Sequence, residues 1–225
     1  MKKYELTQNS IKINNRTLYQ IRAFKDFGSV KKGDLGGYIE SEKNLSHDGN
    51  CWISGNAQVY GNALVSGNAQ VFGDAQVYGN VQVFGNAKVY GNALVFDNAR
   101  IHENAQVCEN TRVSEDAEIS GNAQVSGNTQ VSGNAWVYGK AEVSGDVEVF
   151  GNASVSGDAR VSGDARVFGD AHIYGNVHLG RVPVNFNCDF DPYESVMKIL
   201  DHKEILPTLL GIDSGLDKMI LERLK

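Results

Sequence analysis

The chain has 225 residues, of which 41% are apolar, and a net charge of −6 at pH 7. This length fits one domain or two, and no apolar run is long enough to cross a bilayer. Lysine and arginine do not cluster as phosphate contacts require, so the composition disfavours direct nucleic-acid binding. The start MKKYELTQNSIKIN has no apolar signal segment. Three cysteines, an odd count, indicate unpaired thiols in a reducing cytoplasm.

Residues 1–48 precede the regular repeat and predict a small N-terminal β cap. We expect Tyr4–Leu6 and Ile11–Ile13 to pair around a polar Gln-Asn-Ser turn, and Leu18–Phe24 to form a further strand. The run KKGDLGG is expected to form a turn, and the partial hexad KNLSHD at Lys43 leads into the repeat. Nine basic and six acidic residues give this segment a charge of +3.

A six-residue repeat then extends from Gly49 to Gly180 as 22 consecutive hexads, without an insertion or deletion. Position one is mostly Gly, position two Asn or Asp, position three nearly always Ala, and position five Val or Ile until Leu179. Positions four and six vary. Positions three and five therefore face one side of a short strand and four and six the other. Positions one and two form a corner, because Gly and Asn tolerate positive φ.

Strands this short bury their Ala and Val only when successive coils cover one another. A helical repeat would need 3.6-residue spacing, and a hairpin meander would need turn residues suited to reversing strands. The pattern therefore predicts a parallel β-helix, whose open backbone edges need caps at both ends.

The order aliphatic, any, Gly, Asn or Asp, small, any resembles the hexapeptide repeat of left-handed parallel β-helices, in which three hexads make one triangular coil. The resemblance implies an all-β fold of about seven coils, on the order of 35 Å long at ~4.8 Å per strand. The steps GGYI at Gly36 and GNCWI at Gly49, within Leu18 to Ala63, resemble the start of YdcK-type proteins of bacteria and prophages. Those proteins are often labelled transferases, and the resemblance implies no established activity or active-site residue.

Residues 181–225 follow the repeat and predict a helical C-terminal cap or oligomerisation segment. Pro183 removes a backbone donor soon after the last hexad. Helical apolar spacing is present at 193–202 and again at 216–224. We expect this segment to cover the last coil or to pair with that of another subunit.

Aromatic side chains recur at position six of every third hexad, and we expect them to form an outward column. They have three interpretations: the rings stack along the rod, form a homo-oligomer interface, or contact a foreign protein. The self-association candidates are Tyr60, Tyr78, Phe96, Phe150 and Phe168, with Ser114 and Ser132 between the two groups.

Acidic residues concentrate in the middle of the repeat, where four of them replace the corner Gly. The hexads at 49–180 contain six basic and thirteen acidic residues, a charge of −7. These acids could keep the rod in solution, bind a basic protein, or imitate a nucleic-acid polyanion. The partner-binding candidates, called the acidic waist below, are Asp97, Glu103, Glu109, Glu115, Asp116 and Glu118.

The sequence predicts no catalytic, cofactor-binding or metal-binding residue. His102, His172 and His178 occupy outward positions of intact hexads, where a surface role is the simplest interpretation. His172 and His178 are one hexad apart, hence on adjacent faces, which disfavours a metal pair. Acyltransferases of the hexapeptide type resemble this coil, but they use a histidine beside a loop that leaves it, and 49–180 contains no such loop.

The favoured hypothesis is a non-enzymatic, cytoplasmic, homo-oligomeric scaffold that binds a protein without a cofactor. Its acidic and aromatic surface favours a partner that is basic or itself binds nucleic acid. The resemblance to prophage proteins implies a phage-related protein that binds or inhibits a host protein. The alternative hypothesis is an acyltransferase of the hexapeptide type with an acyl-CoA donor.

Overall fold

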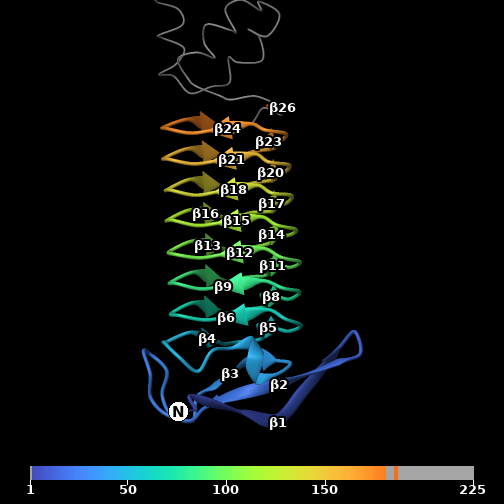
Figure 1. Cartoon of the computed structure of the whole chain (residues 1–225), viewed down its shortest axis with the longest axis vertical. Coiled ribbons are helices and arrows are strands. Elements are labelled where there is room, and N and C mark those ends of the chain that lie inside the picture. The colour runs from blue at the N-terminus through green and yellow to red at the C-terminus, as the bar shows by residue number, and fades with distance from the viewer. Residues whose placement is uncertain (1, 181–184, 187–225) are drawn as a thin grey trace, which may run out of the picture.

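The computed structural model describes residues 2–180 and 185–186, and this part of the chain is a parallel β-solenoid of about eight turns (Figure 1). Its only helical segment among the described residues is a 3-10 turn, η1 (Glu42–Asn44). The predicted all-β solenoid is thus confirmed, and its left-handed sense stays a prediction. The helices predicted within 181–225 lie outside the described residues.

The strands form three sheets, one for each face of the solenoid, and the two-residue strands follow one another around it. The first face contains β3 (Leu35–Ile39), β5 (Gln58–Val59), β8 (Gln76–Val77), β11 (Leu94–Val95), β14 (Arg112–Val113), β17 (Gln130–Val131), β20 (Glu148–Val149), β23 (Arg166–Val167) and β26 (Asn185–Phe186). The second face contains β4 (Trp52–Ile53), β7 (Gln70–Val71), β10 (Lys88–Val89), β13 (Gln106–Val107), β16 (Gln124–Val125), β19 (Glu142–Val143), β22 (Arg160–Val161) and β25 (His178–Leu179). The third face contains β6 (Leu64–Val65), β9 (Gln82–Val83), β12 (Arg100–Ile101), β15 (Glu118–Ile119), β18 (Trp136–Val137), β21 (Ser154–Val155) and β24 (His172–Ile173).

Each residue of a hexad lies beside its equivalent three hexads later, as in the parallel pair Gln58↔Gln76. Backbone N–H groups at positions two, four and six donate to the next coil, for example from Gln58 N to Ala75 O at 2.9 Å. The Ala, Val and Ile side chains of positions three and five are fully buried along most of the rod. The predicted inward positions are therefore confirmed.

Strands β1 (Tyr4–Ile13) and β2 (Arg16–Ala23) form an antiparallel hairpin with its turn at Asn14 and Asn15. The predicted pairing of Tyr4–Leu6 with Ile11–Ile13 is wrong, since both segments lie in β1, with a register shift between Leu6 and Ser10. Asn14 and Asn15 have φ values of 45° and 64°. Two successive residues at positive φ suit the twist of a tight hairpin, so this Asn pair outcompetes the Gln-Asn-Ser turn.

The prediction of a turn through KKGDLGG is wrong at its end, because Gly36 and Gly37 belong to strand β3. This strand pairs antiparallel with β2 and parallel with β5. A Cβ at Gly36 would lie 2.5 Å from the Ile53 carbonyl oxygen, and one at Gly37 2.5 Å from that of Ala57. The glycines therefore allow the cap to lie directly against the first hexads.

The partial hexad before Gly49 joins the solenoid, since Leu45 is buried and forms a parallel bridge with Val65. Together with β3, it adds a turn below the first complete hexad. This addition explains why the solenoid has about eight turns where the hexads alone predict about seven.

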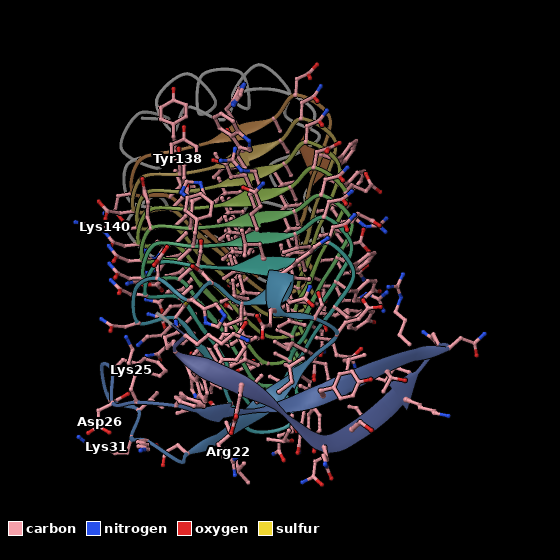
Figure 2. All side chains as sticks on the ribbon, turned by 60° about the horizontal axis from the view of Figure 1, so that its bottom comes forward. Arg22, Lys25, Asp26, Lys31, Tyr138 and Lys140 are labelled. Atoms are coloured by element: carbon pink, nitrogen blue, oxygen red, sulfur yellow. The ribbon has the colours of Figure 1, made fainter. Side chains whose placement is uncertain are left out.

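The hairpin crosses the N-terminal end of the solenoid (Figures 1 and 2). Lys3 is buried there, and its Nζ donates to the carbonyl oxygens of Cys51 at 2.9 Å and Gly49 at 3.3 Å. The hydroxyl of Tyr4 donates to the Leu45 carbonyl at 2.7 Å, and burial raises the pKa of this phenol. Backbone acceptors at the open edge are thereby satisfied by side chains of the cap.

Side-chain amides at position two form ladders along all three corners. In most steps the Asn Nδ2 donates to Oδ1 of the position-two residue one coil further on. Asn86 Nδ2, for example, donates to Asn104 Oδ1 at 3.0 Å. An Asp accepts but has no Nδ2 to donate, so each Asp ends a ladder. The longest ladders are Asn62–Asn80–Asn98–Asp116, Asn68–Asn86–Asn104–Asn122 and Asn92–Asn110–Asn128–Asp146.

We predict opposite effects for two isosteric exchanges in these ladders. Asn104→Asp keeps the acceptor for Asn86 but loses the donor to Asn122, so the free energy of unfolding should fall by about 1 kcal/mol. Asp116→Asn keeps the acceptor for Asn98 and gains a donor toward Asn134, so stability should stay equal or rise. Urea unfolding at pH 7 measures both. Equal effects of the two exchanges would contradict a stabilising role for the ladders.

Candidate interaction surface

The aromatic column predicted on the first face is present as two stacks of side chains. Tyr60 and Tyr78 stack with ring centroids 4.9 Å apart, and Tyr78 and Phe96 at 5.5 Å. Phe150 and Phe168 stack at 5.2 Å near the other end of the face. The rings therefore cover one another along the solenoid, and Tyr60 is only 7% exposed.

Within the hexads, the most exposed rings lie on the third face. Trp136 is 52% exposed and Tyr138 40%, and the two meet edge to face with centroids 6.2 Å apart. Tyr174, two coils beyond Tyr138, is 42% exposed. Figure 2 places Tyr138 on the side of the solenoid, well away from the cap. Sequence reasoning missed Trp136, although its signal is simple: positions four and six of one hexad both carry large rings.

Four acids of the waist occupy successive corners of the solenoid in the left-handed backbone region. The φ values are 60° at Asp97, 58° at Glu103, 60° at Glu109 and 59° at Glu115. A residue with a Cβ in this region costs about 1 kcal/mol or more, which Gly avoids at the other corners. Because the solenoid has three corners, these acids surround it as a ring and do not gather into one patch.

The corner carboxylates bind the backbone of the next coil. Glu103 Oε2 accepts from the N–H of Gly121 at 2.7 Å, and Glu109 Oε2 from that of Gly127 at 2.7 Å. Asp97 Oδ2 makes a longer bond of 3.3 Å to the Glu115 N–H. The corner N–H has no backbone acceptor in the coils that the structure describes. Three of the four corner acids thus cap a backbone N–H of the next coil that has no backbone acceptor.

The remaining two waist acids bind side chains. Asp116 Oδ1 accepts from Asn98 Nδ2 at 3.1 Å at the end of a ladder. Glu118 pairs with Arg100 at 3.3 Å and with Nε2 of His102 at 2.9 Å. The imidazole of His102 also stacks on Phe84, with centroids 4.7 Å apart. Glu118 therefore lies within a polar cluster of the third face, apart from the ring of corner acids.

The other histidines lie where the hexads place them. His172 is on β24 of the third face and His178 on β25 of the second, so the two do not share a column. Nδ1 of His172 lies 2.6 Å from Ser154 Oγ. Within the described residues, no group of three or more side chains suited to a metal ion occurs.

Neither thiol in the described part of the chain is activated as a nucleophile. Burial raises the pKa of Cys51 against the opposing effect of Lys3, and burial also raises the pKa of Cys108. A hydrogen bond with Cys108, together with burial, raises the pKa of Tyr90 to about 12. None of the helical structure in residues 2–180 and 185–186 has the length and apolar character of a bilayer span.

Two-residue strands, three parallel sheets and glycine corners define a hexapeptide-repeat β-solenoid. The family model described as YdcK Beta solenoid repeat matches residues 57–73, 87–103 and 159–175, each nearly one coil long. These matches, on a parallel β-solenoid, support a YdcK-type β-solenoid repeat protein, as the N-terminal resemblance predicts. A search of curated proteins found no match.

We predict that two corner acids differ in their effect on stability. Glu103→Gly removes a strained φ and also the bond to the Gly121 N–H, so the two effects should nearly cancel. Glu115→Gly removes the same strain, and the Glu115 carboxylate makes no hydrogen bond among the described residues, so unfolding should cost about 1 kcal/mol more. Thermal and urea unfolding compare the two variants. If Glu103→Gly raises the free energy of unfolding as much as Glu115→Gly does, the hydrogen bond from the Gly121 N–H to Glu103 contributes nothing to stability.

Proposed function

We propose that the protein is a non-enzymatic scaffold that binds a basic protein partner through its acidic waist. The observation that supports this proposal most is the placement of acids at four successive positive-φ corners. Charge needed only for solubility could stand at positions two, four or six, where the backbone is not strained. Acids at corners, where Gly serves almost everywhere else, favour a use for the charge itself.

The corner geometry suits contact with a cationic partner. One oxygen of Glu103 and one of Glu109 accept a backbone N–H, which fixes each carboxylate at the edge of the solenoid. The second oxygen of each remains a hydrogen-bond acceptor for lysine or arginine of a partner. The hexads as a whole have a charge of −7, which would attract a basic protein over a distance of about a Debye length.

A partner of this kind includes proteins that bind nucleic acid, whose basic surfaces would accept an acidic rod in place of a polyanion. The resemblance to prophage proteins supports a host protein as the partner, and the cysteine count supports a cytoplasmic location. The host partner and the cytoplasmic location are therefore parts of the proposed function.

We predict that removing charge at the waist abolishes partner capture without unfolding the rod. The variant combines Asp97→Asn, Glu103→Gln, Glu109→Gln and Glu115→Gln, which keeps a carbonyl oxygen for the three corner N–H groups that the acids cap. Immobilised protein is incubated with lysate of its bacterial host, and captured proteins are quantified by mass spectrometry over a salt series. Basic proteins should be depleted on the variant and should elute from the parent at moderate salt.

The matched control removes four negative charges elsewhere, by Asp146→Asn, Asp158→Asn, Asp164→Asn and Asp170→Asn. This control should capture the same partner as the parent. If both variants lose partner capture equally, capture depends on net charge and not on the waist. If the waist variant captures as much partner as the parent, the waist is ordinary surface.

We also propose homo-oligomerisation through exposed rings. Among the predicted candidates Tyr60, Tyr78, Phe96, Phe150 and Phe168, the rings largely cover each other. Trp136 and Tyr138 present more surface, and a pair of exposed aromatic side chains is typical of a protein interface. The third face therefore supplies a better interface than the first.

We predict that two ring deletions separate these roles. Tyr78→Ser loses stacking with both Tyr60 and Phe96, so unfolding should require about 1–2 kcal/mol less while the particle mass stays unchanged. Trp136→Ser should leave stability within about 0.5 kcal/mol and lower the sedimenting mass. Sedimentation velocity at several concentrations provides the readout. If the sedimenting mass falls for Tyr78→Ser and not for Trp136→Ser, the subunit interface lies on the first face.

A further inference from the structure

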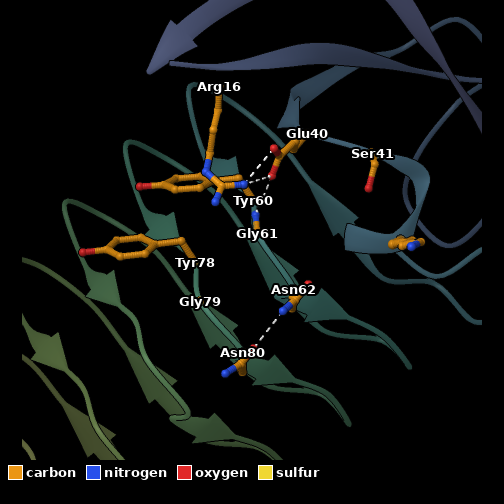
Figure 3. A pocket seen from close by; sticks show the side chains of 10 residues that line it. Arg16, Glu40, Ser41, Tyr60, Gly61, Asn62, Tyr78, Gly79 and Asn80 are labelled. Atoms are coloured by element: carbon orange, nitrogen blue, oxygen red, sulfur yellow. Dashed lines mark hydrogen bonds and ion pairs between the residues drawn. The ribbon is translucent and has the colours of Figure 1, made fainter. Parts of the chain in front are cut away.

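A groove of about 520 Å³ lies where the N-terminal cap meets the first two coils (Figure 3). Arg16 of the hairpin, Glu40 after β3 and Lys43 of η1 line its cap side. The corner residues Gly61 and Gly79, with the adjacent stacked rings of Tyr60 and Tyr78, line its solenoid side. The groove is distinct from the acidic waist, whose first residue lies one coil beyond Gly79.

One carboxylate of the chain already binds in this groove. Arg16 Nη1 donates to both oxygens of Glu40 at 2.8 Å, and Glu40 Oε2 also accepts the N–H of Gly61 at 2.8 Å (Figure 3). The groove thus combines a guanidinium with an outward corner N–H, and this combination holds a carboxylate.

The same donor recurs one coil further on. Gly79 occupies the corner directly after Gly61 in the stack of coils, so the translation that relates the coils turns its N–H toward the groove in the same way. Within the described residues this N–H has no hydrogen-bond acceptor. At the waist, Glu103 supplies the acceptor for the equivalent corner of the next coil, and Gly61 has no side chain to do so for Gly79.

Other donors surround this corner. Arg16 uses Nη1 for Glu40, and its Nε and Nη2 groups have no acceptor in the described part of the chain. Lys43 has no ion pair among the same residues, so the lining has two cations and one anion. Figure 3 shows the stacked rings of Tyr60 and Tyr78 beside this corner, with their hydroxyls directed away from Glu40.

We propose that this groove binds a carboxylate, presented by an acidic segment of a partner protein, on the N–H of Gly79. The carboxylate takes the place that a glutamate side chain at position 61 would occupy. An added Cβ at Gly61 lies 3.2 Å from Gly79 N, which is where such a side chain would begin. This site prefers a partner opposite in charge to the one proposed for the waist, and it stands independently of that proposal.

Amide chemical shifts measured by NMR test the site directly. The ¹⁵N-labelled protein is titrated with a blocked hexapeptide of glutamate, with the same peptide of glutamine, and with glutarate. The glutamate peptide should shift the Gly79 amide in a saturable, salt-sensitive manner, and the glutamine peptide should not. A shift with glutarate as well would assign recognition to the carboxylate alone, and a shift with the peptide only would add contacts from the segment. No shift with either, or an equal shift with glutamine, overturns the proposal.

A variant that supplies its own carboxylate gives the second test. Gly61→Glu should cap the Gly79 N–H, as Glu103 caps Gly121, and weaken peptide binding at least about tenfold. Gly55→Glu is the matched control: its φ of 67° is close to the 70° of Gly61, its Cβ would lie 3.2 Å from Gly73 N, and it does not line the groove. The control should bind like the parent. Equal weakening in both variants, or unchanged binding by Gly61→Glu, overturns the proposal.

Discussion

The backbone hydrogen bonds between coils, repeated at every third hexad, determine nearly everything else in this protein. Gln58 N donates to Ala75 O, and the same bond recurs from Gln76 N to Ala93 O. Because the coils are related by translation, each side chain lies next to its counterpart in the neighbouring coil. Rings meet rings, amides meet amides, and a corner acid meets the corner N–H above it. A single substitution is therefore judged by what occupies the same position one coil away.

The repeat allows the core to be predicted with almost no error, because burial follows from the alternation within one hexad. Even the inward threonines are accommodated, since Thr111 Oγ1 donates to the Cys108 carbonyl at 2.7 Å. The aromatic column was also predictable, since it needs only a comparison of equivalent positions in successive coils. The amide ladders needed that comparison at position two as well. There Asn was interpreted only as a turn residue, so the contact between coils was missed.

The two wrong predictions, the Gln-Asn-Ser hairpin turn and the end of the KKGDLGG turn, lie outside the repeat, where no translation constrains the chain. The hairpin turn depends on which polar pair best tolerates positive φ, and Asn14 and Asn15 are favoured over the Gln-Asn-Ser step. Gly36 and Gly37 are needed for close approach and not for a turn, and this depends on backbone atoms of Ile53 and Ala57 that sequence does not place. Likewise, the sequence shows that Glu103 replaces a corner Gly but not that its carboxylate binds Gly121 N.

The corner N–H explains how so uniform a rod can still contain distinct sites. Every coil repeats this donor on each edge, and the acceptor comes from a waist acid at Gly121 and Gly127 and from the cap at Gly61. Where the corner residue of the preceding coil is Gly, the chain provides no carboxylate at that place, as at Gly79. Whether the protein supplies a carboxylate there decides whether a corner N–H is capped from within or accessible to another molecule. In a translational repeat, distinct sites arise where residues depart from the consensus. Binding is therefore expected at such positions, which here are Asp97 to Glu115 and the junction at Glu40.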